Sequence, residues 1–271
     1  MLATAAKQES EISKPAARLG AQFARFIESE IARWVRPAAA ILEREGARAA
    51  AAYEQTGYEA EALEAVSEVE WQRYIERVWL STVPRAGAFF GEMFNPAPPE
   101  PKAAAASFDT DFFLQAAVDW LRAYAAERVE SITDTSRDEI GNQIRIGVQK
   151  GESRKQIAER IVKHRRSITP ERAMTIARTE VHAAANFGSL TAAQQVNAPL
   201  NKFWIARPDA RDTHAAAGGQ RRTLDAAFTV GGYSLKHPGD SSMGAPAREV
   251  INCRCVISFE IRWPRGRRRA A

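Results

Sequence analysis

Apolar residues recur every three or four positions in the first 80 residues, which is the spacing that places side chains on one face of an α-helix. The first stripe consists of Leu19, Phe23, Phe26, Ile27, Ile31, Trp34, Val35, Ile41 and Leu42. Pro37 lies within it and is expected to kink or split the helix. A second stripe predicts a helix over residues 59–80, and Pro84 lies just past its expected end.

Four prolines in residues 95–107 (NPAPPEPKAAAAS) interrupt this pattern and favour an extended connector. Asp109 or Thr110 is suited to cap the next helix. Three shorter helices are then expected, and their boundary signals are Gly151, the capping-box pair Ser153 and Gln156, and Thr169 followed by Pro170. Helix is therefore the predicted structure on both sides of this connector, up to residue 199.

The pattern changes near residue 200, where helical periodicity disappears. The run NKFWIA favours a β-strand, glycine-rich turns follow, and EVINCRCVISFEIRW predicts a long final strand. The predicted fold is mainly α with a small C-terminal α+β domain. The predicted organisation is an N-terminal helical region (1–94), a proline-rich linker (95–107), a helical region (108–199), an α+β domain (200–262) and a basic tail (263–271).

The only two cysteines of the chain, Cys253 and Cys255, lie in the predicted final strand. Two cysteines cannot form a disulfide framework and agree with a reducing compartment. Residues i and i+2 of a strand share a face with Cα atoms about 6.6 Å apart, so that both thiolates can reach one metal ion. The candidate zinc ligands are His214, His237, Cys253 and Cys255, with Asp240 as a substitute for His237. The alternative is two small thiols that pack in the core without any cofactor.

Several short motifs follow one another in a fixed order between residues 140 and 259. Their residues are Arg178, Thr179, Glu180, Asp209, Arg211, His214, Pro238, Gly239, Asp240, Asn252, Cys253, Arg254 and Cys255. Together with the upstream stretches GESRKQIAERI and SITPERAMTIARTEVHAAAN, this order resembles the Mu F-like family of phage head morphogenesis proteins. These are minor capsid proteins that accompany the portal inside the heads of tailed phages.

The resemblance implies a non-enzymatic minor head protein of a tailed phage or prophage. Its implied partners are the portal protein and the capsid or scaffold proteins, and its implied place is inside the head near the portal, where DNA enters or leaves. No segment of the sequence has the form of a signal peptide or a membrane span, so we expect assembly in the host cytoplasm. Some relatives carry toxin domains beyond this region, and because the sequence ends at Ala271 we expect none here.

Positive charge gathers at the C-terminal end of the sequence. From residue 200 onward, 13 Lys/Arg stand against 6 Asp/Glu, a balance of +7, within a total net charge of +5. The candidate DNA-contacting residues are Arg262, Arg265, Arg267, Arg268 and Arg269. Such a segment suits non-specific contact with the phosphates of double-stranded DNA, which weakens as salt rises. The alternative is a solvated tail that keeps the protein soluble.

Two other functions agree with the same residues. One is a nuclease-like or transferase-like enzyme that uses Asp209, Arg211 and His214 in a cleft beside the cysteines. The other is a zinc-stabilised DNA-binding protein unrelated to virions, which predicts stoichiometric metal and salt-dependent DNA binding without affinity for a portal ring.

Overall fold

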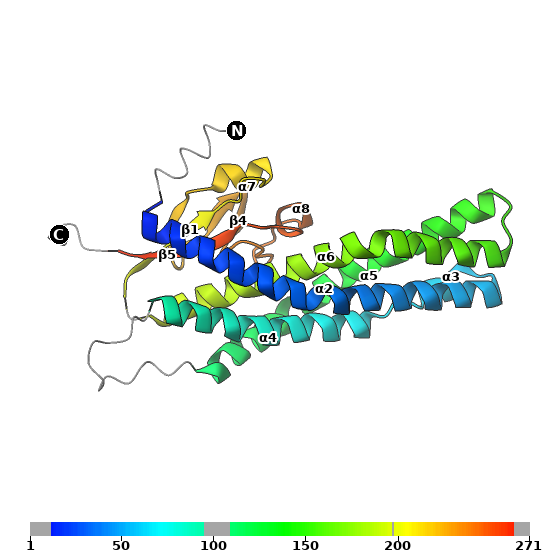
Figure 1. Cartoon of the computed structure of the whole chain (residues 1–271), viewed down its shortest axis with the longest axis horizontal. Coiled ribbons are helices and arrows are strands. Elements are labelled where there is room, and N and C mark those ends of the chain that lie inside the picture. Colours follow the sequence, from blue (N-terminus) through cyan, green and yellow to red (C-terminus); the bar gives the residue numbers. More distant parts are fainter. Residues whose placement is uncertain (1–11, 95–108, 197, 263–271) are drawn as a thin grey trace. The chain divides into compact units, whose positions relative to one another are not determined.

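The computed structural model describes residues 12–94, 109–196 and 198–262 (Figure 1). The helices of the body are α2 (Lys14–Thr56), α3 (Glu59–Leu63), α4 (Glu68–Phe94), α5 (Thr110–Gln149) and α6 (Arg154–Gln195). The remaining elements are β1 (Leu200–Ile205), α7 (Asp212–Ala217), β2 (Arg221–Thr223), β3 (Phe228–Val230), β4 (Tyr233–Leu235), α8 (Ala247–Val250) and β5 (Val256–Ile261). The predicted fold class is confirmed. Within the described residues, no helix combines the length and hydropathy needed to cross a bilayer.

Two of the predicted helix starts are confirmed by their capping contacts. Asp109 Oδ1 accepts hydrogen bonds from the backbone N–H groups of Asp111 (3.1 Å) and Phe112 (3.2 Å) at the start of α5. Ser153 and Gln156 form a reciprocal capping box at the start of α6, with N–O distances of 2.8 and 3.3 Å. These side chains satisfy backbone donors that the first turn of a helix leaves free.

The predicted helix boundaries at Pro84 and Pro170 are wrong, and Pro37 does not split its helix. Pro37 lies inside α2, Pro84 inside α4 and Pro170 inside α6. Residues 110–149 also form one helix instead of two. A proline inside a helix costs about 3 kcal/mol, and buried contacts on both sides of it can offset that cost. Pro170 illustrates this, because Arg165 and Arg172 on either side of it both bind Glu139 of α5.

The described chain divides into two compact units, and the long helices contribute segments to both. One unit, called here the helical unit, contains Ile31–Trp79 and Asp119–Ala177. The other, called here the sheet unit, contains the described residues of Met1–Glu30, Leu80–Val118 and Arg178–Ala271. The predicted linker (95–107) and tail (263–271) lie outside the described residues, and the predicted domain boundaries stay a prediction.

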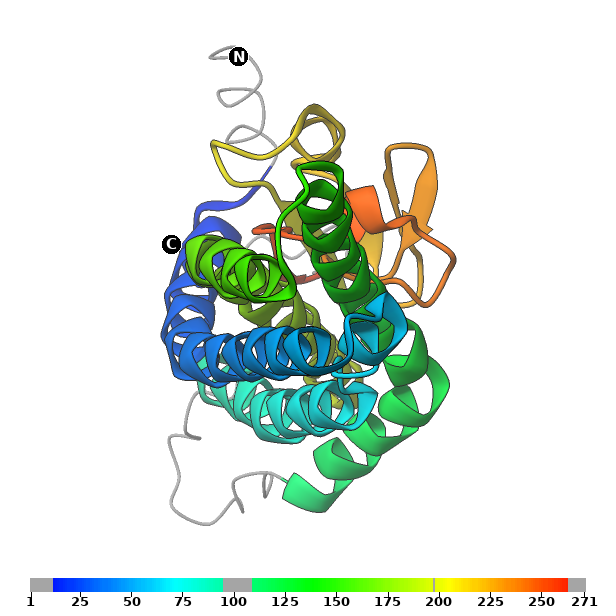
Figure 2. The ribbon, with the colours of Figure 1, turned by 90° about the vertical axis from the view of Figure 1, so that its right-hand side faces the viewer.

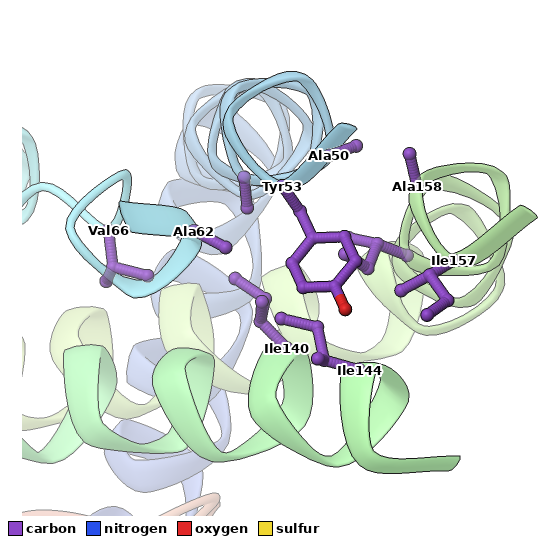
Figure 3. Close-up of a cluster of buried hydrophobic side chains, with 10 residues drawn as sticks. Ala50, Tyr53, Ala62, Val66, Ile140, Ile144, Ile157 and Ala158 are labelled. Atoms are coloured by element: carbon purple, nitrogen blue, oxygen red, sulfur yellow. The ribbon is translucent and has the colours of Figure 1, made fainter. Parts of the chain in front are cut away.

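In the helical unit, segments of α2, α4, α5 and α6 run side by side (Figures 1 and 2). One part of its core is an apolar cluster drawn in Figure 3. Its buried members are Ala49, Ala50, Tyr53, Ala62, Val66, Ile140, Ile144, Ile157, Ala158 and Ile161. The small alanines of α2 and α6 leave room for the Tyr53 ring, which points between α5 and α6.

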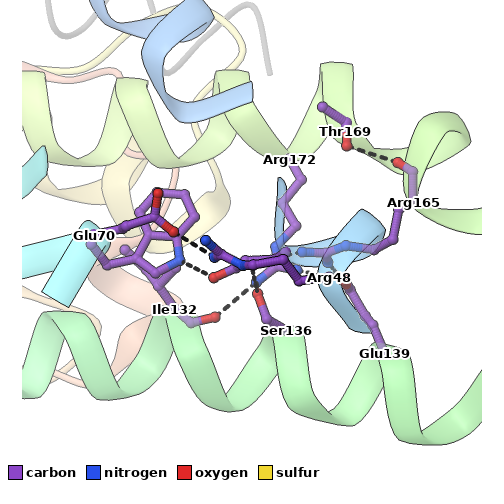
Figure 4. Close-up of polar contacts among 10 residues, drawn as sticks. Arg48, Glu70, Ile132, Ser136, Glu139, Arg165, Thr169 and Arg172 are labelled. Atoms are coloured by element: carbon purple, nitrogen blue, oxygen red, sulfur yellow. Dashed lines mark hydrogen bonds and ion pairs between the residues drawn. The ribbon is translucent and has the colours of Figure 1, made fainter. Parts of the chain in front are cut away.

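A buried polar network forms a second part of this core (Figure 4). Arg165 of α6 donates to Oε2 of Glu45 on α2 (2.8 Å) and to Oε2 of Glu139 on α5 (2.7 Å). Glu45 also accepts from Trp71 Nε1 of α4 (2.7 Å) and from Ser136 Oγ of α5 (3.1 Å). One carboxylate is therefore bound by side chains from three other helices. Burial raises the pKa of Glu45, and Arg165 and the two hydrogen bonds oppose that rise.

The sheet unit is built on a three-stranded antiparallel sheet in the order β2-β1-β5, beside a β3-β4 hairpin. Helices of the same unit pack on it: Ser258 Oγ of β5 donates to Ala16 O of α2 (2.6 Å). The rings of Phe90 (α4) and Phe259 (β5) meet edge to face at 5.0 Å between centroids. These contacts anchor the final strand to helices from the beginning and middle of the chain.

The predicted final strand is too long at its N-terminal end. Residues 247–250 form the short helix α8, and the strand itself begins only at Val256. Between them the chain turns at Asn252, whose φ of 58° lies in the left-handed region. Cys253 and Cys255 are therefore on a loop, and the strand argument for their shared face is wrong.

Candidate functional site

Three ligand atoms of the kind that bind metals meet in the interior of the sheet unit. His214 lies on α7, and Cys253 and Cys255 lie on the loop before β5. His214 Nδ1 is 3.5 Å from Sγ of Cys253 and 3.5 Å from Sγ of Cys255. Both thiols are free, and all three residues are buried. The Trp204 ring of β1 covers the imidazole edge to face, with 5.4 Å between centroids.

The opposite nitrogen of the imidazole faces a buried carboxylate. His214 Nε2 is 3.2 Å from Oε2 of Glu249 on α8, although the two groups lack the alignment of a hydrogen bond. Thr213 Oγ1 donates to the same carboxylate oxygen at 2.8 Å. Glu249 is only 3% exposed, so its carboxylate is held inside the site and is not a surface charge. The sequence analysis did not single out Glu249.

The two thiols differ in acidity because they share one proton. A hydrogen bond from Cys253 and the neighbouring His214 together lower the pKa of Cys255 to about 5, against the opposing effect of burial. The same hydrogen bond, together with burial, raises the pKa of Cys253 well above its usual value. The directions of the two shifts favour a thiolate at Cys255, beside the imidazole. Sulfur anions and imidazole nitrogen are ligands that zinc prefers.

The motif on α6 directly holds the loop that carries the cysteines. Arg178 donates to Oδ1 of Asn252 at 2.6 Å, and Asn252 N donates to Thr179 Oγ1 at 2.9 Å. Glu180, next along the helix, is buried at 2% exposure. The side chains of Arg178 and Thr179 thus fix Asn252 at the left-handed turn from which the cysteine loop continues.

The three residues of the enzyme alternative do not converge on one another. Asp209 forms an ion pair with Arg254, and Arg211 donates to the carbonyl of Ile251 at 2.6 Å. His214 contacts the cysteines and Glu249 instead. Arg211 therefore holds the chain just before the cysteine loop, and Asp209 holds Arg254 between the two cysteines.

His237 lies in a different turn from the other three predicted zinc ligands. Its Nδ1 is 3.0 Å from the carbonyl of Pro238, and burial lowers the pKa of its imidazole. Asp240 closes this turn by accepting from Lys236 N (2.7 Å) and Ser242 N (2.8 Å). Gly239 has a φ of 82°, and a Cβ there would lie 3.1 Å from Ala183 Cα of α6. The HPGD motif therefore packs a tight turn against α6.

Asn186 is a structural residue of α6 that contacts the cysteine loop and β5. Its Oδ1 accepts from Ile257 N of β5 at 2.8 Å, and its Nδ2 donates to His182 O at 2.8 Å and to Cys255 O at 3.4 Å. The amide thus acts as an extra strand partner for β5 and joins it to α6. A polar residue in the alanine-rich run VHAAAN was the available sequence signal.

Two further basic groups are buried in the sheet unit. Burial lowers the pKa of His182 to about 3, so this imidazole is neutral at physiological pH. Burial also lowers the pKa of Lys202 to about 8, while Asp240 opposes the shift. Lys202 Nζ donates to Lys236 O at 2.8 Å and lies 5.0 Å from the centre of the Phe228 ring. Lys202 thereby ties β1 to the turn after β4.

Of the predicted DNA-contacting residues, the described part of the chain includes only Arg262. Its side chain is exposed, and its backbone N donates to Pro199 O at 2.7 Å. Arg265, Arg267, Arg268 and Arg269 lie outside the described residues.

The fold and the site define a mainly helical protein with a small α+β region whose cysteine loop is held by motif residues. Residues 138–258 match the family model described as phage Mu protein F like protein. The predicted resemblance is confirmed for this segment, which runs from the second half of α5 to β5 and is similar to Mu F-like proteins. No curated protein and no solved structure matches the chain.

Proposed function

We propose that this protein is a non-enzymatic minor head protein that binds the portal or the inside of the procapsid and contacts the packaged DNA. The observation that carries the proposal is the Mu F-like match over residues 138–258. The contacts of the site agree with a structural role, since Arg178, Thr179, Asp209 and Arg211 each stabilise the cysteine loop. The predicted place of the protein is the interior of the head near the portal, after assembly in the host cytoplasm.

Binding to the portal is tested by co-sedimentation. The protein is co-expressed with the portal and major capsid proteins encoded beside it, treated with nuclease and separated on a gradient. We expect it to migrate with portal rings or procapsids, because a minor head protein is incorporated through protein contacts. Omitting either partner in turn identifies which one it binds. If the protein remains at the top of the gradient in every combination, the assembly role is wrong.

Contact with DNA is tested by the salt dependence of binding to a non-specific duplex. Changing Arg265, Arg267, Arg268 and Arg269 to glutamine should weaken binding and reduce the slope of log K against log salt by up to about 4, because each phosphate contact contributes about 0.9. The matched control removes the same charge from exposed positions elsewhere: Arg25, Arg122, Lys150 and Lys155. Equal loss in both variants would show that net charge, not the tail, is responsible.

A further inference from the structure

The distances within the cysteine loop are those of a zinc coordination sphere. Tetrahedral zinc with Zn–S of about 2.3 Å and Zn–N of about 2.0–2.1 Å places its nitrogen and sulfur ligands about 3.5–3.6 Å apart. His214 Nδ1 is 3.5 Å from each of the two sulfur atoms. The three ligand atoms all lie within 4.8 Å of one another.

We propose that this protein binds one zinc ion through His214 Nδ1, Cys253 Sγ and Cys255 Sγ. The proposal goes beyond the role in head assembly and does not depend on it. His237 is left out, because its imidazole contacts the carbonyl of Pro238 in a separate turn. In the part of the chain that the structure describes, these three residues form the one group of His, Cys and carboxylate side chains able to share an ion. These three side chains would leave one tetrahedral position for a further ligand.

Glu249 has the position of a residue that orients a zinc-binding histidine. Ligation through Nδ1 requires the proton to be on Nε2, and Nε2 is 3.2 Å from the Glu249 carboxylate, close enough for a hydrogen bond once the two groups align. Thr213 donates to that carboxylate and fixes it. A carboxylate behind the second nitrogen is the usual arrangement for zinc-binding histidines, because it sets the tautomer and the direction of the ring. Glu249 is therefore a positioning residue and not a fourth ligand.

The site connects α7 to the loop before β5, two segments that are not paired by strand hydrogen bonds. His214 is on the six-residue helix α7, and the cysteines are on a loop that precedes β5. The described strands of this region are only three to six residues long. Small α+β regions with little core commonly need a metal or another cross-link for stability. Zinc at this point would fasten α7 to the final strand.

The direct test is metal analysis of the full-length protein purified without chelator, followed by cobalt titration of the chelator-treated protein. We expect about one zinc per chain, and a cobalt spectrum with sulfur-to-metal charge transfer and the intense visible bands of tetrahedral coordination, saturating at one equivalent. Chelation should lower the melting temperature, and zinc should restore it. A folded protein without stoichiometric zinc or tetrahedral cobalt bands would overturn the proposal and leave two packed thiols.

Four variants then test the ligand set and the role of Glu249. Cys253→Ser or Cys255→Ser should abolish the charge-transfer bands or halve their intensity, and His237→Gln, which alters a buried histidine outside the site, should leave them unchanged. Glu249→Gln should keep one equivalent of cobalt with roughly 10- to 100-fold weaker affinity. If His237→Gln removed the bands, the ligand set would be wrong. If Glu249→Gln changed neither affinity nor spectrum, its positioning role would be wrong.

Discussion

Replacing Arg165 with methionine is expected to lower the free energy of unfolding by about 3–5 kcal/mol, the cost of leaving buried charges without their partner. Arg165 is 2% exposed and binds both Glu45 and Glu139. Methionine fills a similar volume, so the loss of packing is small and the loss of charge compensation dominates. Glu45 is fully buried, and it would keep only the hydrogen bonds from Trp71 and Ser136 and a weaker attraction from Arg172.

Denaturant unfolding of the full-length protein, followed by circular dichroism, measures this effect. The matched control is Arg137→Met on α5, because Arg137 also reaches another helix through Glu68 (2.7 Å) but is one-third exposed. Exposed ion pairs contribute about 0–1 kcal/mol, so the control should change stability little. A loss at Arg165 no larger than that of the control would mean that water enters the network and that it is not a buried charge cluster.

The same network explains why local sequence signals set some helix boundaries correctly and others wrongly. Ser153 and Gln156 cap a helix through partners three residues away, so the sequence contains the whole interaction. The residues around Pro170 predict the start of a helix, but Pro170 lies inside the continuous helix α6. The contacts that maintain the helix there come from Glu139, about 30 residues earlier in the chain. The local sequence contains the proline, but it does not contain Glu139, whose contacts offset the energetic cost of the proline.

In the candidate site, too, some residues can be predicted from their type alone, whereas the role of others depends on the fold. Cys253, Cys255 and His214 were predictable because the chain has only two cysteines and four histidines, which leaves few choices for a soft metal. Glu249 was not, because nothing local distinguishes it among 33 acidic residues. Its role depends on α8 bringing it to Nε2 of His214. His237 was an equally reasonable choice by residue type, and only the fold separates it from the cluster.

The order of the family motifs also acquires a physical meaning in the structure. Arg178 and Thr179 lie more than 70 residues before Asn252, and their side chains bind its amide oxygen and its backbone N–H. The motif on α6 and the motif around the cysteines are therefore two halves of one contact. In the sequence, two motifs that contact each other in this way appear as separate short motifs. Only the fold of the intervening strands and turns brings them together in space.

A single added methyl group at Gly188 is expected to destabilise the sheet unit by about 1–3 kcal/mol, in the range of other overpacked sites. Gly188 lies on α6, and a Cβ there would lie 2.5 Å from the backbone oxygen of Val83 on α4. A backbone atom cannot rotate away as a side chain does, so the two helices must separate. Alanine is intrinsically better than glycine inside a helix by about 1 kcal/mol, which the clash must exceed.

Gly91→Ala on α4 is the matched control, because a Cβ at that position meets no atom within 4 Å. The same substitution should there stabilise the protein by up to about 1 kcal/mol through helix propensity alone. Denaturant midpoints of the two variants and the wild type, measured side by side, should therefore shift in opposite directions. Stabilisation by both alanines would show that α4 and α6 do not approach as closely at Gly188 as this packing requires, and that glycine is not needed there.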